Sequence, residues 1–159
     1  MTQAKTRIYL SACISNALNN EYICSKFPVE QYIFDLPQKI TPKELNHENF
    51  PLDVYQQCIN MMEASDLGLL LLDSYGRDCA WEAGWYTARP GKKLVAFVES
   101  SSHFTRDWMI KGGIDIFVTT NPRIYQYALG DPILRHKTII FLDSIEHIAE
   151  KISDALCHK

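Results

Sequence analysis

The sequence predicts an α/β domain in which a five-stranded, mainly parallel sheet carries helices on both faces. Short apolar runs alternate along the chain with segments of helical spacing, which is the order that βαβ units produce. Residues 67–72 form a continuous apolar run, as expected of a strand buried on both faces of a parallel sheet. A chain of 159 residues has the size of one domain with its own core, so residues 1–159 are expected to form a single domain.

Strand-like and helical segments follow one another along the whole chain. The strand-like segments are residues 7–13, 31–36, 67–72, 93–98, 114–119 and 138–142. The helical segments are residues 16–27, 53–64, 79–88 and 145–156, the last with Ser144 as its cap, and residues 103–112 are expected to form a helical turn. Residues 37–51 contain three prolines and are expected to form an irregular loop.

Composition and charge exclude several classes of protein. The net charge is −3 and the basic residues are scattered, so no overall field draws the chain to nucleic acid or to an anionic membrane. No apolar run approaches the length that spans a bilayer. The five cysteines form no CxxC pair, which favours reduced thiols in the cytoplasm over a zinc site or a disulfide framework. We expect neither a metal nor a cofactor.

An acidic cluster follows the strand at residues 67–72. Asp73, Asp78 and Glu82 lie there, where a parallel sheet binds its ligands, and Glu82 is expected in the first turn of the next helix. The positive helix end would keep Glu82 ionised, and an ionised carboxylate can attack an electrophilic sugar carbon. A second interpretation stays open, in which Asp78 caps the helix and Glu82 only complements the helix dipole. The chain has neither a GxxxxGK[ST] loop nor a GxGxxG loop after its first strand.

Three segments of the chain resemble the nucleoside 2-deoxyribosyltransferase family. The family's Asp-led apolar strand, acidic loop, Glu-x-Gly helix start and Gly-Lys pair have counterparts in DLGLLLLDSYGRDCAWEAGWYTARPGKKLVAFV. The family's opening strand resembles RIYLSAC, and a downstream segment that reaches into a neighbouring subunit's site resembles TRDWMIKGG. The matches keep the family's order over residues 7–118, and residues 120–137 look like an insertion or a local rearrangement. This resemblance implies a flavodoxin-like, Rossmann-like three-layer sandwich.

The same resemblance implies a reaction. Glu82 would attack the anomeric carbon of a nucleoside, expel the base and form a glycosyl ester, which a second base or water would then release. Tyr9 would be the second catalytic residue, hydrogen-bonded to the sugar or to the carboxylate. Substrate-binding roles fall on Asp73, Asp78, Cys58, Gly76, Asp107 and Met109. Because Asp107 would come from a partner subunit, the resemblance implies a homodimer or a larger homo-oligomer with shared sites.

Two positions depart from the family pattern. Cys58 stands where the family has an aspartate that orients the sugar and handles protons on the base, and Gly76 stands at another acidic position. Asp78 is a candidate to take over the contact with the base. These departures keep a catalytically weak nucleoside- or nucleotide-binding module as an alternative to an enzyme. A receiver-like signalling domain is a weaker alternative, because such domains carry an acidic pair at the end of the first strand and this chain lacks it.

A further alternative is an N-hydrolase of nucleoside 5′-monophosphates. Such hydrolases share the family's motifs but carry a serine at the position of Asp107. A carboxylate would repel a phosphate there by about 4 kcal/mol at 4 Å for an effective dielectric constant near 20. We therefore favour nucleosides over nucleotides as the ligand.

Overall fold

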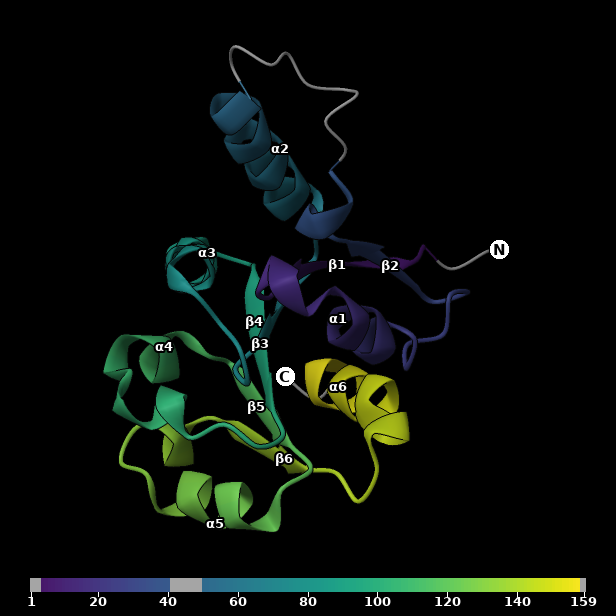
Figure 1. Ribbon diagram of the computed structural model, residues 1–159. Coiled ribbons are helices and arrows are strands. Elements are labelled where there is room, and N and C mark those ends of the chain that lie inside the picture. The colour runs from purple at the N-terminus through teal and green to yellow at the C-terminus, as the bar shows by residue number, and fades with distance from the viewer. Residues whose placement is uncertain (1–3, 41–49, 158–159) are drawn as a thin grey trace.

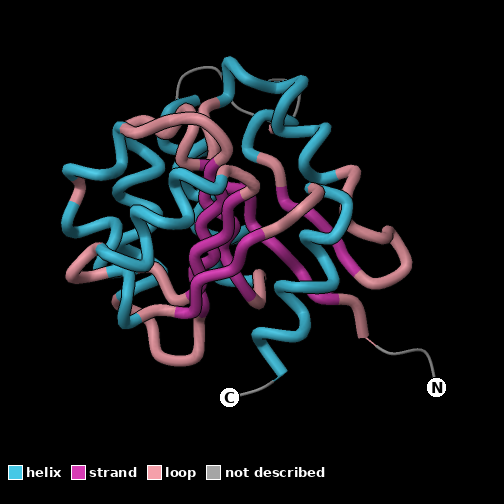
Figure 2. Tube along the Cα trace, turned by 90° about the horizontal axis from the view of Figure 1, so that it is seen from below, coloured by secondary structure: helices cyan, strands magenta, loops and turns pink. Residues whose placement is uncertain are grey.

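The computed structural model describes residues 4–40 and 50–157, which form one sheet between two layers of helices (Figures 1 and 2). The sheet order is β2-β1-β3-β4-β5-β6, and every neighbouring pair is parallel. The strands are β1 (Thr6–Ser11), β2 (Tyr32–Asp35), β3 (Leu67–Leu71), β4 (Lys93–Val98), β5 (Ile116–Thr119) and β6 (Thr138–Phe141). The order of β1 to β5 is the flavodoxin-like one, so the predicted fold class is confirmed.

Helices cover both faces of the sheet. On one face lie α1 (Ala17–Cys24) and α6 (Ile148–Cys157), and on the other lie α2 (Phe50–Ala64), α3 (Arg77–Thr87), α4 (Trp108–Gly113) and α5 (Pro122–Gly130) (Figure 1). Short 3₁₀ turns join them: η1 (Ile14–Asn16), η2 (Pro37–Lys39), η4 (His103–Arg106), η5 (Leu134–His136) and η6 (Ile145–His147). Alternate residues of β3 enter the two cores, with Leu69 on the α1 and α6 side and Leu70 on the other.

The prediction of five strands was one too few. Residues 120–137, interpreted as an insertion or a local rearrangement, contain α5 and η5, and α5 is the crossover that brings β6 parallel to β5. The sequence carries a start signal for α5, because the Asn121 side chain accepts hydrogen bonds from two backbone N–H groups of the first turn and Pro122 occupies the first helical position. β6 lies at the edge of the sheet and is only half-buried.

The predicted helix positions agree with α1, α2, α3 and α6 to within three residues at each end. Ser144 caps η6, which leads into α6, and the expected turn at 103–112 is η4 followed by α4. Of the loop expected at residues 37–51, residues 37–39 form η2, residues 50 and 51 begin α2, and residues 41–49 lie outside the described residues. None of the helices within residues 4–40 and 50–157 is long and apolar enough to cross a bilayer.

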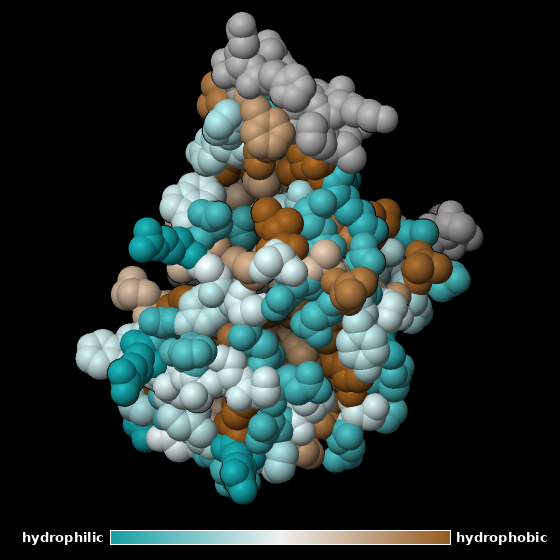
Figure 3. All heavy atoms as spheres, viewed as in Figure 1, coloured by the Kyte–Doolittle hydropathy of each residue, from teal (hydrophilic) through white to brown (hydrophobic). Residues whose placement is uncertain are grey.

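Figure 3 shows apolar side chains over α2, where Leu52 is exposed.

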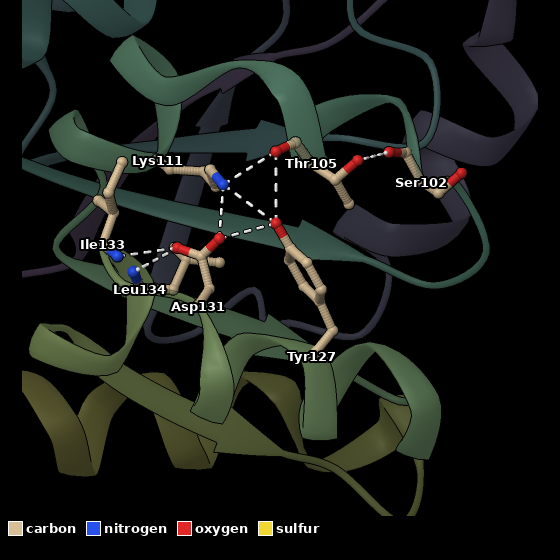
Figure 4. A network of polar contacts seen from close by, with 7 residues as sticks. All are labelled: Ser102, Thr105, Lys111, Tyr127, Asp131, Ile133 and Leu134. Atoms are coloured by element: carbon tan, nitrogen blue, oxygen red, sulfur yellow. Dashed lines mark hydrogen bonds and ion pairs between the residues drawn. The ribbon is translucent and has the colours of Figure 1, made fainter.

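A buried ion pair joins α4 to the end of α5 (Figure 4). The Lys111 ammonium donates to the Asp131 carboxylate at 2.6 Å, to the Tyr127 hydroxyl at 3.0 Å and to the Thr105 carbonyl at 2.9 Å. The other Asp131 oxygen accepts two backbone N–H groups that lead into η5, each at 2.9 Å. Lys111 is 3% exposed and Asp131 4%. Because both charges are fully partnered, the pair fixes η4, α4 and the end of α5 relative to one another.

Gly68 allows β3 and α3 to pack closely against each other. A Cβ at this position would lie 2.7 Å from a ring carbon of Tyr86, whose hydroxyl is 2.6 Å from that of Ser65. Because this ring is fully buried, we expect Gly68→Ala to lower the free energy of unfolding by about 1–3 kcal/mol in a urea titration. Gly84→Ala on α3 is the matched control, since nothing lies within 4 Å of the added carbon. Equal stability of Gly68→Ala and wild type would contradict this packing argument.

Candidate active site

The Glu82 side chain reaches from α3 to the end of β1. Its two carboxylate oxygens each accept one hydrogen bond, from the Tyr9 hydroxyl and from the Ser11 hydroxyl, both at 2.5 Å. Tyr9 and Ser11 are two residues apart on β1, so their side chains leave the strand on the same face. β1 pairs with β2 on one side and β3 on the other, which is the switch point where flavodoxin-like sheets bind ligands.

Glu82 lies one turn further into the helix than expected. α3 begins at Arg77, so Glu82 is its sixth residue, and Gly76 rather than Asp78 is the N-cap residue. The helix dipole acts mainly within the first turn. The orientation of the Glu82 carboxylate therefore comes from the two hydroxyl donors rather than from the helix end.

Burial sets the protonation of this cluster. It raises the pKa of Glu82 above the ordinary range, while the hydrogen bonds from Ser11 and Tyr9 act in the opposite direction because they stabilise the ionised form. Burial and the neighbouring Glu82 charge raise the pKa of Tyr9. Tyr9 therefore keeps its proton and remains a hydrogen-bond donor to the carboxylate.

A pocket of about 550 Å³ opens beside Glu82. The segment after β1, α2 and the first turns of α3 line it. Its lining residues are Ala12, Cys13, Ile14, Pro37, Pro51, Val54, Tyr55, Cys58, Ile59, Met62, Gly76, Asp78, Cys79, Trp81 and Glu82. The pocket has the size and the largely apolar lining that small-molecule ligands require.

The structure brings several of the predicted site residues together at this pocket. Glu82, Cys58, Asp78 and Gly76 line it, and Tyr9 lies behind Glu82. Burial raises the pKa of the Cys58 thiol, the nearby Tyr9 hydroxyl acts in the opposite direction, and the charges of Glu82 and Asp78 raise the pKa further. Cys58 is therefore a neutral thiol in the wall of the pocket.

Asp73 lies outside this pocket, so the structure does not bring it together with Glu82, and its expected contact with substrate stays a prediction. Its carboxylate accepts the backbone N–H groups of residues 99, 100 and 101, each at 2.7 Å, and the Ser100 hydroxyl at 3.0 Å. Both oxygens are thus engaged in holding the loop after β4. The sequence could not reveal this role, because it depends on β4 lying beside β3.

Asp107 and Met109 also lie away from the pocket of their own chain. They precede and begin α4, where Trp108 is 72% exposed and Met109 89%. A shallow hollow beside them is also lined by Tyr75 and Ala80 of the β3–α3 segment. Their expected part in a neighbouring subunit's site stays a prediction.

Three residues beside Glu82 or in its pocket were not among the predicted site residues. Ser11 was predictable, since a strand places it on the same face as Tyr9. Tyr55 of α2 and Trp81 of α3 lie edge to face with ring centres 6.0 Å apart and line the pocket. No local sequence pattern predicts that these two rings meet, because α2 and α3 come together only in the tertiary structure. Within residues 4–40 and 50–157, no group of three or more His, Cys, Asp or Glu side chains is placed to hold a metal ion.

Comparison with known proteins places the fold. A 2-deoxyribosyltransferase from the psychrotolerant bacterium Bacillus psychrosaccharolyticus superposes with a TM-score of 0.55 and 16% sequence identity, over 70% of this chain and 85% of that chain. No family model matches the sequence, and neither does any curated protein. The resemblance seen in three short sequence segments therefore holds for the architecture, and this chain has the fold of a 2-deoxyribosyltransferase.

Proposed function

We propose that this chain is an enzyme that cleaves or exchanges the N-glycosidic bond of a nucleoside, with Glu82 as the nucleophile. The observation that carries the proposal is the Glu82 carboxylate, held by hydroxyl donors at 2.5 Å on each oxygen beside a pocket of about 550 Å³. The fold shared with a 2-deoxyribosyltransferase supports the substrate class.

The proposed reaction has two displacements. A Glu82 oxygen attacks the anomeric carbon as the bond to the base breaks, and the base leaves with the electron pair of that bond and takes up a proton from solvent, which leaves a glycosyl ester. Water or a second base then attacks the same carbon, loses a proton to solvent and restores the carboxylate. The hydroxyls of Tyr9 and Ser11 aim the carboxylate before the reaction, so little reorganisation is needed as its charge is consumed.

The test is base release from a panel of nucleosides, deoxynucleosides and their 5′-monophosphates, followed by chromatography. We expect release from nucleosides in preference to 5′-monophosphates, because the charged residues lining the described part of the pocket are both carboxylates. Rapid acid quenching and peptide mass spectrometry are expected to find the sugar attached to Glu82. Absence of base release with every compound would overturn the proposal in favour of a binding module.

The pH dependence of base release provides a second test. Because the pKa of Glu82 is raised and the ionised form is the nucleophile, activity is expected to fall on acidification at a pH above the ordinary glutamate range. Ser11→Ala removes one donor to the ionised form, so its acid limb is expected to move to higher pH by about one unit. Superimposable profiles of kcat against pH for the two proteins would contradict this role of Ser11.

A further inference from the structure

The charged side chains that line the described part of the pocket are of one sign. Glu82 and Asp78 are the charged side chains among its described lining residues, and no Lys, Arg or His is among them. The charge that acts on Glu82 is that of Asp78, another carboxylate, which opposes its ionisation. A cationic ligand would relieve this repulsion and an anionic one would add to it.

The apolar part of the lining also suits a flat cation. Tyr55 and Trp81 present half-exposed rings at the pocket, edge to face with centres 6.0 Å apart. An aromatic face attracts a cation through its quadrupole, and tryptophan does so most strongly. Cys58, Cys79 and Met62 also line the pocket, and sulfur-containing side chains are polarisable.

None of the residues described at the pocket is a good acid for a departing base. A neutral nucleoside base leaves readily only if it gains a proton as the bond breaks, and general acids contribute about 10²–10⁴-fold to such steps. Cys58 is a thiol of raised pKa, and the proton of Tyr9 is already donated to Glu82. Asp78 is exposed to solvent. A base that carries a positive charge in the nucleoside needs no proton, because it leaves as a neutral molecule.

We propose that the preferred substrates are nucleosides whose base is cationic at the glycosidic bond, namely N-ribosylpyridinium or N-alkylpurinium compounds. This inference rests on the proposed function. The Glu82 carboxylate forms a bond to the anomeric carbon, and the electron pair of the broken bond neutralises the base. Water then displaces Glu82, so one cationic nucleoside and one water give a neutral base, a free sugar and one proton. Opposite charges disappear in the first step, which an apolar pocket favours over bulk water.

The kinetic test compares 7-methylguanosine with guanosine, in the ribo and 2′-deoxy series. Two ratios are compared: the ratio of kcat/KM for the methylated compound to kcat/KM for guanosine, and the ratio of their uncatalysed hydrolysis rates. We expect the first ratio to be at least about tenfold larger than the second. Cys58→Asp places an acid in the wall of the pocket. We expect this variant to release the base of guanosine faster, and so to lower the ratio of kcat for 7-methylguanosine to kcat for guanosine. A wild-type ratio no larger than the uncatalysed one would overturn the inference while leaving the proposed function in place.

A binding test is independent of catalysis. 1-Methylnicotinamide and nicotinamide have no sugar and differ by one methyl group and one positive charge. We expect calorimetry to give at least about tenfold tighter binding of the cation, and Asp78→Asn to reduce that preference several-fold. Tighter binding of the cation without turnover of any nucleoside would support the charge preference and overturn the proposed function. Equal affinities would overturn the inference.

Discussion

Replacing Glu82 with glutamine is expected to lower base release by at least about 10³-fold, as is usual when a nucleophile is lost. Glutamine keeps the shape of the side chain, and its amide oxygen can accept a hydrogen bond from one of the two hydroxyls, Tyr9 or Ser11, while its NH2 group donates to the other. Its neutral amide is a poor nucleophile. The measurement is the initial rate of base release under saturating nucleoside. The folded structure is expected to persist, because the change removes a buried charge rather than a packing contact.

The matched control is Glu150→Gln, an exposed glutamate on α6, on the opposite face of the sheet. It is expected to keep wild-type activity, and thermal melting of both variants checks that each is folded. If Glu82 only complemented the helix dipole, Glu82→Gln would cost about 0.3–1 kcal/mol of stability with no specific loss of chemistry. Wild-type turnover by a folded Glu82→Gln protein would exclude the covalent mechanism.

Replacing Lys111 with methionine is expected to give the largest loss of stability. The change leaves the Asp131 carboxylate buried without its cation, and breaking a buried pair in this way costs about 3–5 kcal/mol. For a domain of this size the midpoint of thermal unfolding should fall by about 10 °C. Calorimetry measures both quantities.

A double variant separates the buried charge from the packing. Lys111→Met combined with Asp131→Asn removes both charges but keeps an oxygen for the backbone N–H groups that lead into η5, so it is expected to recover part of the lost stability. A double variant less stable than Lys111→Met alone would contradict this account of the network. A melting temperature of Lys111→Met equal to that of the wild type would also contradict this account.

The network also predicts how the effect of Lys111→Met varies with pH. Burial tends to raise the pKa of Asp131, but hydrogen bonds from Lys111, from Tyr127 and from backbone N–H groups outweigh it and hold the pKa below its usual range. This carboxylate therefore adds stability above its unfolded pKa, and that stability is lost as the pH falls towards the folded value. Without Lys111, protonation relieves the buried charge instead. The difference in stability between variant and wild type should therefore shrink on acidification towards about pH 4.

Local pattern was enough to predict much of this protein. The apolar run at residues 67–72 is the central strand β3 with Leu72 directly after it, and helical spacing located α2 and α6. The acidic segment after β3 lies where the chain leaves a parallel sheet, and that position indicated Asp73, Asp78 and Glu82, while the family resemblance selected Glu82 as the nucleophile. These features depend on residues close together in the sequence, so periodicity and turn chemistry reveal them.

The tertiary structure decided which of these residues act together. Asp73 and Glu82 lie in one acidic segment, yet Asp73 holds the loop after β4 while Glu82 reaches the hydroxyls of β1. The packing of α2 against α3 brings Cys58 and Trp81 to one pocket, and the pairing of β1 with β3 brings Ser11 to the Glu82 carboxylate beside it, from positions up to 70 residues apart. Such contacts are set by the order of strands in the sheet and by side-chain packing between helices, and no short stretch of sequence records them.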